Sequence, residues 1–192
     1  MFTEGGKIVL FLGPMFSGKS TALSNTVLKY GYKNKKTVFV NYIGDKRYTD
    51  DGHIVTHEQQ KYKALVCQEL KEKLNELMKY DVIGIDEGQF FPDLVEICDL
   101  LCQNGKIVVV AALSGDFRMK PFPNVSNLIS KADKIQHMKA YCAFCQKSAG
   151  FTLRTVKCDK TLLVGAAEMY KPVCKSCHYA HYVPTGEDKI HS

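Results

Sequence analysis

Residues 13–20 constrain the fold more than any other part of this sequence, because they match the phosphate-binding loop pattern G-x-x-x-x-G-K-[ST] at every fixed position. The apolar run 7–12 before the loop predicts a short buried strand, and apolar residues at helical spacing after it predict a helix. In a strand–loop–helix unit of this kind, the backbone N–H groups of the loop and the positive end of the helix dipole point at the same place, where a phosphate can bind. The chain is therefore predicted to bind a nucleoside triphosphate, rather than to carry a glycine-rich turn with a chance lysine.

Each residue type in the loop has its own part in holding phosphate. Gly13 and Gly18 let the backbone wrap closely around phosphate oxygens. Lys19 would bring a full positive charge to the terminal phosphates, and the hydroxyl of Ser20 would ligate Mg²⁺. The predicted phosphate-binding residues are Gly13, Pro14, Met15, Phe16, Ser17, Gly18, Lys19, Ser20 and Thr21.

The length of 192 residues suits one α/β domain with a small appendage. No run approaches the ~20 apolar residues that a membrane span needs, and the N-terminus lacks the charged-then-apolar build of a signal peptide. We therefore expect a soluble, cytoplasmic protein without a membrane partner.

The net charge of +6 raises the question of a nucleic-acid partner. The basic residues are dispersed, however, and the densest patch is only Lys33, Lys35 and Lys36. A solvated surface explains this patch about as well as a contact with a phosphate backbone would. Charge alone does not decide between the two, and we expect no nucleic-acid partner.

The next segments continue the α/β pattern. Residues 37–42 predict a second strand, and a long polar loop follows over 44–53. Asp45 and Arg47 come just after the strand's carboxyl end, where α/β sheets place ligands, although solvated loop charges remain the alternative. Residues 64–80 show an apolar stripe at helical spacing and predict a packing helix.

An apolar strand over 81–85 ends in two adjacent carboxylates. After a phosphate-binding loop, an acid at such a strand end is the expected second anchor for Mg²⁺, and we assign this role to Asp86. Glu87 then stands where a general base could take a proton from an attacking hydroxyl. An ATPase could use the same pair to orient water, and two surface acids are the plain alternative.

Strand and helix patterns continue to alternate after these acids. Residues 94–101 predict a helix and 106–113 a strand, which completes a parallel, doubly wound sheet covered on both faces. Of Phe90 and Phe91, at least one is expected in the core, while the other could stack on a planar base. Two further aromatic residues on the ligand side of the sheet are Phe117 and Phe122.

The composition changes after residue 140, where two C-x-x-C pairs bracket a segment of under thirty residues. This spacing is the signature of a tetrahedral zinc site, with disulfides as the alternative. Four thiolates leave no open position on the metal, so the zinc is expected to be structural and to clamp a lid. His178 and His181 are expected to be surface or packing residues. The predicted ligands are Cys142, Cys145, Cys174 and Cys177.

These features predict a P-loop parallel sheet flanked by helices, with a small C-terminal zinc-binding lasso domain. The expected divisions are an ATP-binding domain over 1–140, a zinc-binding lasso domain over 141–184 and a flexible tail over 185–192.

The combination of motifs resembles the type II thymidine kinases, which are cytosolic and contain zinc. The resemblance spans nearly the whole chain and rests on residues 13–21, 45–48 and 85–91 together with the two cysteine pairs. It implies transfer of the γ-phosphoryl group of ATP to the 5′-hydroxyl of thymidine, with Mg²⁺ and one structural Zn²⁺. It also implies a homotetramer inhibited by thymidine triphosphate.

The resemblance further implies roles for individual residues. Glu87 matches the general base, Asp45 and Arg47 match the metal–phosphate region, and Ser20 and Asp86 match the Mg²⁺ positions. The residues matching the thymidine pocket and its lasso are Met15, Phe90, Leu113, Phe117, Phe122, Leu163, Val164, Gly165 and Tyr170.

The sequence departs from the family pattern at two positions. Ser114 stands where the family usually has an acid, and Ala166 stands where the lasso often has a second glycine. The first leaves the role of that position open, and the second reduces backbone freedom without necessarily altering base binding.

Three other functions fit parts of the pattern. A zinc-ribbon nucleic-acid-binding P-loop ATPase would use the same loop and cysteines, but the chain has no second motor domain and no concentrated basic stripe. A GTP-binding switch would need the guanine-reading sequence Asn-Lys-x-Asp, which the chain lacks. A non-catalytic nucleotide sensor would not need Lys19, Asp86 and Glu87 intact.

Overall fold

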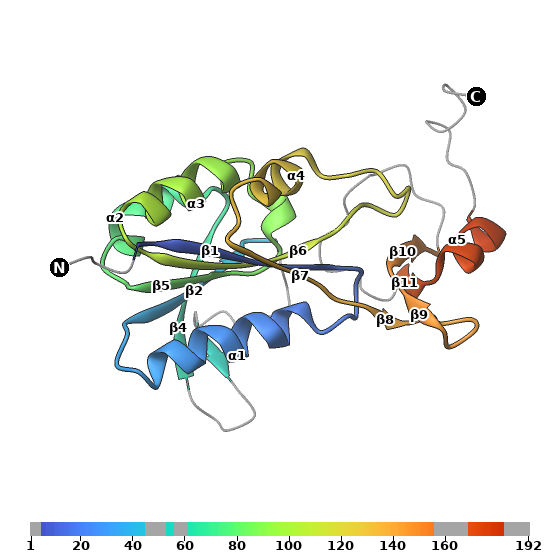
Figure 1. The fold of residues 1–192 in the computed structure, drawn as a ribbon, viewed down its shortest axis with the longest axis horizontal. Coiled ribbons are helices and arrows are strands. Elements are labelled where there is room, and N and C mark those ends of the chain that lie inside the picture. Colours follow the sequence, from blue (N-terminus) through green and yellow to red (C-terminus); the bar gives the residue numbers. More distant parts are fainter. Residues whose placement is uncertain (1–4, 45–52, 56–60, 156–168, 183–192) are drawn as a thin grey trace.

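A seven-stranded sheet forms the centre of the molecule (Figure 1), in a computed structural model that describes residues 5–44, 53–55, 61–155 and 169–182. The sheet was predicted to be parallel, and six of its strands are, including β4 and β7, which the sequence did not predict as strands. The edge strand β3 runs antiparallel and pairs with β4. The strand order is β3-β4-β2-β5-β6-β1-β7. The bounds are Lys7–Gly13 for β1, Thr37–Tyr42 for β2, His53–Val55 for β3, Lys61–Cys67 for β4, Val82–Ile85 for β5, Ile107–Leu113 for β6 and Lys134–His137 for β7.

Helices cover both faces of the sheet (Figure 1), because the central strands are apolar on both sides. On one face α1 (Lys19–Gly31) buries Leu23 and Val27 against Val9, Phe11 and Phe39. The opposite face carries α3 (Leu94–Gln103) and α4 (Pro123–Ile129). These two helices cover the larger of the two apolar clusters that pack on the central sheet.

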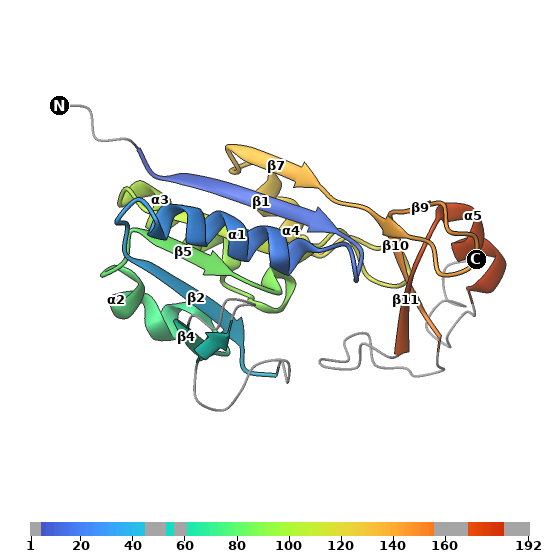
Figure 2. The same cartoon turned by 90° about the horizontal axis from the view of Figure 1, so that it is seen from below.

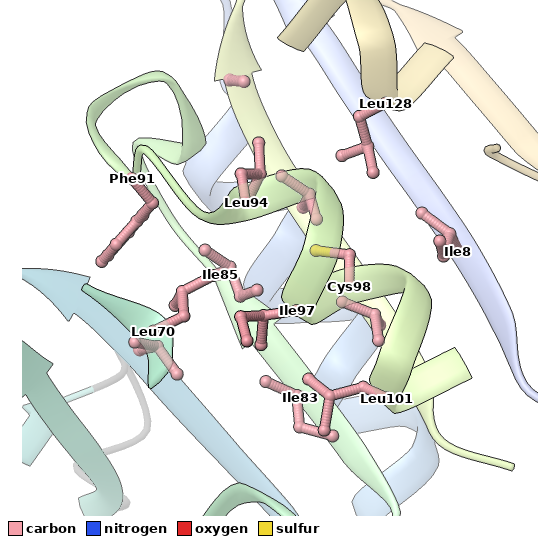
Figure 3. Packing of buried hydrophobic residues seen from close by; sticks show 14 of the residues in the cluster. Ile8, Leu70, Ile83, Ile85, Phe91, Leu94, Ile97, Cys98, Leu101 and Leu128 are labelled. Carbon is pink, nitrogen blue, oxygen red and sulfur yellow. The ribbon is translucent and has the colours of Figure 1, made fainter. Parts of the chain in front are cut away.

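The larger cluster is shown in Figure 3, where Leu94, Ile97 and Leu101 of α3 lie over Ile83 and Ile85 of β5. All five side chains are 3% exposed or less. Burial of one such side chain contributes about 1.5–3 kcal/mol relative to leaving it in water. This packing fixes the end of β5, and with it the two acids that follow the strand.

The helix predicted over 64–80 was partly wrong. Its first four residues belong to β4, and only Leu70–Lys73 (a 3₁₀ turn, η1) and Leu74–Leu77 (α2) are helical. Along the strand Ala64 packs with the α1 cluster and Leu65 with the opposite one. A strand buried on both faces shows a continuous apolar run, which periodicity alone does not separate from a helix.

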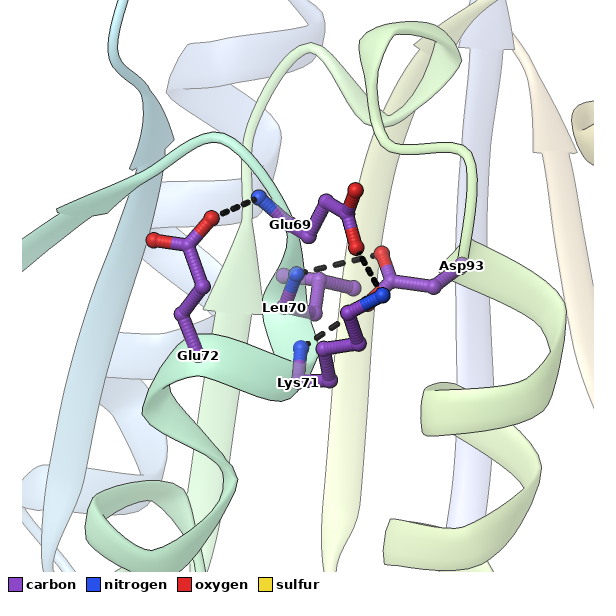
Figure 4. A network of polar contacts seen from close by, with 5 residues as sticks. All are labelled: Glu69, Leu70, Lys71, Glu72 and Asp93. Atoms are coloured by element: carbon purple, nitrogen blue, oxygen red, sulfur yellow. Dashed lines mark hydrogen bonds and ion pairs between the residues drawn. The ribbon is translucent and has the colours of Figure 1, made fainter.

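A polar network ties η1 to the start of α3 (Figure 4). The carboxylate of Asp93 accepts hydrogen bonds from the backbone N–H of Leu70 at 3.1 Å and of Lys71 at 2.8 Å. Glu72 accepts one from the N–H of Glu69 at 2.9 Å, which completes a capping box. The ion pair between Lys71 and Glu69 is at the surface and adds little to stability.

A small C-terminal unit lies beyond the carboxyl ends of the parallel strands (Figure 2). It buries a core of Cys142, Ala149, Leu153 and Val173. Its elements are β8 (Ala140–Tyr141) paired with β9 (Ser148–Ala149), β10 (Phe151–Arg154) paired with β11 (Tyr170–Val173), and α5 (Lys175–His181). Ligands of open α/β sheets bind at this edge, so the unit borders the region where a site is expected.

Within the ranges the structure describes, no helix is both long and apolar enough to cross a membrane.

Candidate functional site

The predicted phosphate loop connects β1 to α1. Gly18 has a φ of 80°, which favours glycine, and a Cβ on Gly13 would lie 2.7 Å from the carbonyl oxygen of Met138. The Lys19 ammonium donates a hydrogen bond to the carbonyl oxygen of Pro14 at 2.6 Å, and the Ser17 hydroxyl donates to the same oxygen at 2.9 Å. The loop is thus closed on itself at the N-terminus of α1, with the lysine folded inward.

The loop and the first predicted acid meet in space. The Ser20 hydroxyl donates a hydrogen bond to Oδ1 of Asp86 at 3.1 Å, although the two residues lie 66 positions apart. Asp86 is 4% exposed and also accepts from the backbone N–H of Glu87 at 3.0 Å. A hydroxyl and a carboxylate at this separation, beside a phosphate loop, are a donor set that suits Mg²⁺.

Glu87 is held by a residue that sequence reasoning missed. The Nε2 of Gln89 donates a hydrogen bond to Oε2 of Glu87 at 2.5 Å, and Oε1 of Gln89 accepts one from the backbone N–H of Leu113 at 3.0 Å. Gln89 is 5% exposed, and Glu87 has a left-handed backbone with φ of 52°. The only sequence signal for this contact was the position of Gln89 in the turn after the acids.

The aromatic residues divide into two groups. Phe91 is fully buried against the edge of Tyr42, whereas Phe90 is half-buried and lies 5.2 Å from the same ring. Phe90 and Phe122 line one hollow of about 650 Å³. One of the Phe90–Phe91 pair is therefore in the core, as expected. Phe117 is not among the lining residues of this hollow.

Phe117 lies instead against the C-terminal unit. The guanidinium of Arg154 stands 3.7 Å from the centre of the Phe117 ring, and its Nη2 donates a hydrogen bond to the hydroxyl of Tyr170 at 3.1 Å. Arg154 is only 6% exposed. The structure thus brings Phe117 and Tyr170 to the same guanidinium. Sequence reasoning did not single out Arg154 as a site residue.

Two more contacts join the C-terminal unit to the α/β domain. The backbone N–H of Met15 donates to the hydroxyl of Thr152 at 3.1 Å. Nε2 of His178 lies 2.8 Å from the carbonyl oxygen of Phe117, so this nitrogen must carry the proton and donate it. His178 is 1% exposed and packs on Tyr182, which agrees with the expected packing role. The C-terminal unit therefore holds both the phosphate loop and Phe117.

The four predicted zinc ligands converge. The Sγ atoms of Cys142, Cys145, Cys174 and Cys177 all lie within 4.8 Å of one another, and those of Cys145 and Cys174 are 3.6 Å apart. Tetrahedral Zn–S bonds of ~2.3 Å would place sulfur atoms about 3.8 Å apart, so the donors fit zinc. The structure shows no disulfide among the described cysteines, these four included.

The thiols of this cluster affect one another's pKa. Burial opposes ionisation of Cys142, but hydrogen bonds from backbone groups near Cys174, Cys145 and Phe144 lower its pKa to about 6. The hydrogen bond with Cys174 and then burial raise the pKa of Cys177 to about 12. Without a metal, Cys142 therefore ionises more easily than Cys177. A divalent cation would stabilise the thiolate form of every cysteine that it ligates.

Several predicted residues lie outside the described residues. These are Asp45, Arg47, Leu163, Val164 and Gly165, and also Ala166. Of the two departures from the family pattern, Ser114 is described: its backbone N–H donates to the carbonyl oxygen of Gly13 at 3.3 Å. This backbone contact does not depend on which side chain stands at position 114.

Comparison with known proteins agrees with this geometry. A family model described as thymidine kinase matches residues 6–178. Thymidine kinase 1 of Dictyostelium discoideum is 43% identical over 176 residues, which cover 90% of this chain and 78% of that protein. The thymidine kinases of vaccinia virus (strain Ankara) and raccoon poxvirus are 42% and 41% identical over 175 residues, 91% of this chain and 98% of each. The chain belongs to the thymidine kinase family.

Proposed function

We propose that this protein transfers the γ-phosphoryl group of ATP to the 5′-hydroxyl of thymidine and releases thymidine monophosphate for DNA synthesis. The observation that carries the proposal is the meeting of Ser20, Asp86 and Glu87 at the phosphate loop of a chain from this family. This arrangement places a metal–phosphate site and a candidate base next to each other. Family membership does not favour the nucleic-acid-binding ATPase alternative.

The donor side of the site is assigned to the phosphate loop, residues 13–21. Backbone N–H groups of the loop bind phosphate oxygens, and Lys19 neutralises charge on the terminal phosphates. Ser20 and Asp86 are the residues proposed to hold Mg²⁺, which would offset negative charge on the phosphates and on the transferring group. Asp45 and Arg47 are proposed for the same metal–phosphate region on the strength of the family pattern.

The acceptor side is assigned to Glu87 as general base. Its carboxylate takes the proton of the 5′-hydroxyl as that oxygen attacks the γ-phosphorus, and Gln89 orients it through the 2.5 Å hydrogen bond. The proposed thymidine-binding residues are Met15, Phe90, Leu113, Phe117, Phe122, Leu163, Val164, Gly165 and Tyr170.

The four-cysteine cluster is proposed to hold one structural Zn²⁺. Its effect on the active site would pass through Thr152, which accepts from the Met15 backbone, and through His178, which donates to Phe117. The C-terminal unit is therefore assigned the task of holding the loop that is shared by donor and acceptor.

Four further properties are proposed from the family resemblance. They are a homotetrameric assembly, feedback inhibition by thymidine triphosphate, a cytoplasmic location, and a division into an ATP-binding domain (1–140), a lasso domain (141–184) and a tail (185–192). Thymidine triphosphate carries both the thymidine group and a triphosphate, so it can occupy the acceptor pocket and the phosphate region together.

Transfer of labelled γ-phosphate to a panel of nucleosides tests the function. With thymidine, deoxyuridine, deoxycytidine and deoxyguanosine as acceptors, thymidine should give the fastest labelled monophosphate. Glu87→Gln should keep thymidine and ATP affinity but lower kcat by about 10²–10⁴-fold, because it removes the base. Asp99→Asn, which changes a surface acid on α3 that pairs with Lys131 and does not line the hollow of Phe90 and Phe122, serves as the control. Near-normal turnover in Glu87→Gln would exclude Glu87 as the base.

A further inference from the structure

Asn41 carries a buried side-chain amide that has no role in the proposed phosphate, metal or thymidine sites. It lies in β2, one residue before the end of the strand, and is 2% exposed. Neither its Oδ1 nor its Nδ2 has a hydrogen-bond partner in the part of the chain that the structure describes. Buried side-chain polar atoms are nearly always paired in folded proteins, so an amide left in this condition requires an explanation.

The alternation of side chains along β2 gives the direction of this amide. Val38 and Val40 pack in the cluster under α3, whereas Phe39 packs in the cluster under α1. Side chains two positions apart on a strand share a face, so Asn41 points to the α1 side, where the phosphate loop begins.

The strand register gives its neighbour on that face. Val40 of β2 pairs with Ile85 of β5, and the N–H of Asp86 donates to the carbonyl oxygen of Val40 at 3.1 Å. Asn41 therefore stands beside Asp86, at the ~4.8 Å spacing of adjacent strands. Asp86 in turn accepts the hydrogen bond of Ser20 from α1. On its other side Asn41 pairs with Val66 of β4, which offers no polar side-chain atom.

The burial of Asn41 matches that of the phosphate-site residues around it. Lys19 is 7% exposed and Asp86 is 4% exposed. Asn41 is therefore about as buried as the side chains that are expected to bind the metal and the phosphates.

We infer that Asn41 is a further binding residue for the metal-bearing end of the triphosphate, an inference that rests on the proposed phosphate site. Its Nδ2 donates to a phosphate oxygen, and its Oδ1 accepts from a water on the divalent cation. A neutral amide suits this position, because another carboxylate beside Asp86 would repel the phosphates. Burying an apolar residue of the same size would cost less free energy, but such a residue could bind neither the phosphate oxygen nor the water.

The variant Asn41→Leu tests the inference because it keeps the side-chain volume and removes both polar atoms. The melting temperature of the ligand-free protein should rise by about 2–4 °C, since an unpaired buried amide is removed. The affinity for a non-hydrolysable ATP analogue with Mg²⁺, measured by calorimetry, should fall about tenfold or more, as expected for a lost hydrogen bond to a charged group. The affinity for thymidine alone should not change.

Asn104→Leu is the matched control, since its exposed amide donates to Leu100 at the far end of α3 and should leave nucleotide affinity intact. If Asn41→Leu does not fold, Asn41→Ala takes its place, with the same loss of affinity expected. Unchanged affinity for the Mg²⁺ complex, or equal losses for thymidine and nucleotide, would overturn the inference. Failure of the unaltered protein to bind the Mg²⁺ complex would instead overturn the proposed phosphate site.

Discussion

Glu87 occupies an unusual backbone conformation at the point where chemistry is proposed. A left-handed φ of 52° in a residue other than glycine costs free energy, which the surrounding contacts must offset. The hydrogen bond from Gln89, which is itself fixed by Leu113, supplies such a contact. The geometry of the carboxylate therefore depends on a neighbour two positions along the chain.

Gln89 should act as a positioning residue for the Glu87 carboxylate. Gln89→Leu removes the donor to Glu87 and should lower kcat by about tenfold or more, because the base loses its orientation. The KM for ATP should change little, since Gln89 does not contact the phosphate loop in the described structure. Steady-state kinetics with thymidine and ATP varied separately checks both values. A larger effect on the KM for ATP than on kcat would contradict a positioning role.

The roles of single residues differed in how well the sequence could predict them. Lys19, Ser20 and Asp86 were predictable because the spacing of the loop and the end of a buried strand carry the signal. Gln89, Arg154 and Asn41 were not, since nothing in their local pattern tells a buried polar residue from an exposed one. Their importance arises only from contacts made across the fold.

At the scale of elements, β10 and α5 connect the cysteine cluster to the active site. Thr152 in β10 contacts the Met15 backbone, and His178 in α5 contacts Phe117. Cys177 lies in α5 together with His178, and Cys174 is the residue immediately before this helix. Loss of the metal should therefore loosen both contacts.

The zinc prediction follows from this connection. Cys145→Ser removes one exposed ligand and should lower zinc content from about one ion per chain, reduce the melting temperature and raise the KM for thymidine. Metal analysis and thermal unfolding of the purified protein measure these changes. Ser176→Ala, in α5 but outside the ligand set, is the control. Absence of zinc from the unaltered protein would remove the four-cysteine assignment.

The central strands β1, β2, β5 and β6 and the helices α1 and α3 were predictable from periodicity, and β4 shows why other elements were not. Its residues Ala64–Cys67 are apolar on both faces, and a helical stripe of Leu70, Leu74 and Leu77 follows immediately. The two patterns merge into one apparent helix in the sequence. Only pairing with β2, a contact between distant segments, decides that the first part is a strand.

At the scale of the whole molecule, the carboxyl edge of the sheet gathers the separate parts of the site. The phosphate loop follows β1, the two acids follow β5, and Ser114 after β6 donates to Gly13. Parallel strands all end at this edge, so the sequence could predict the gathering from their order. The sequence could not predict how the C-terminal unit packs at this edge. Its contacts with Met15 and Phe117 depend on the three-dimensional path of the chain.

ATP turnover by this protein should depend on a 5′-hydroxyl placed beside Glu87. The most direct test measures ATP consumption with thymidine, 3′-deoxythymidine and 5′-deoxythymidine, and with no acceptor. We predict rapid consumption with the first two, and with 5′-deoxythymidine no consumption above the level without acceptor, together with competitive inhibition against thymidine. ATP consumption at the same rate in all four cases, or stimulation by DNA instead, would contradict the assignment as a nucleoside kinase.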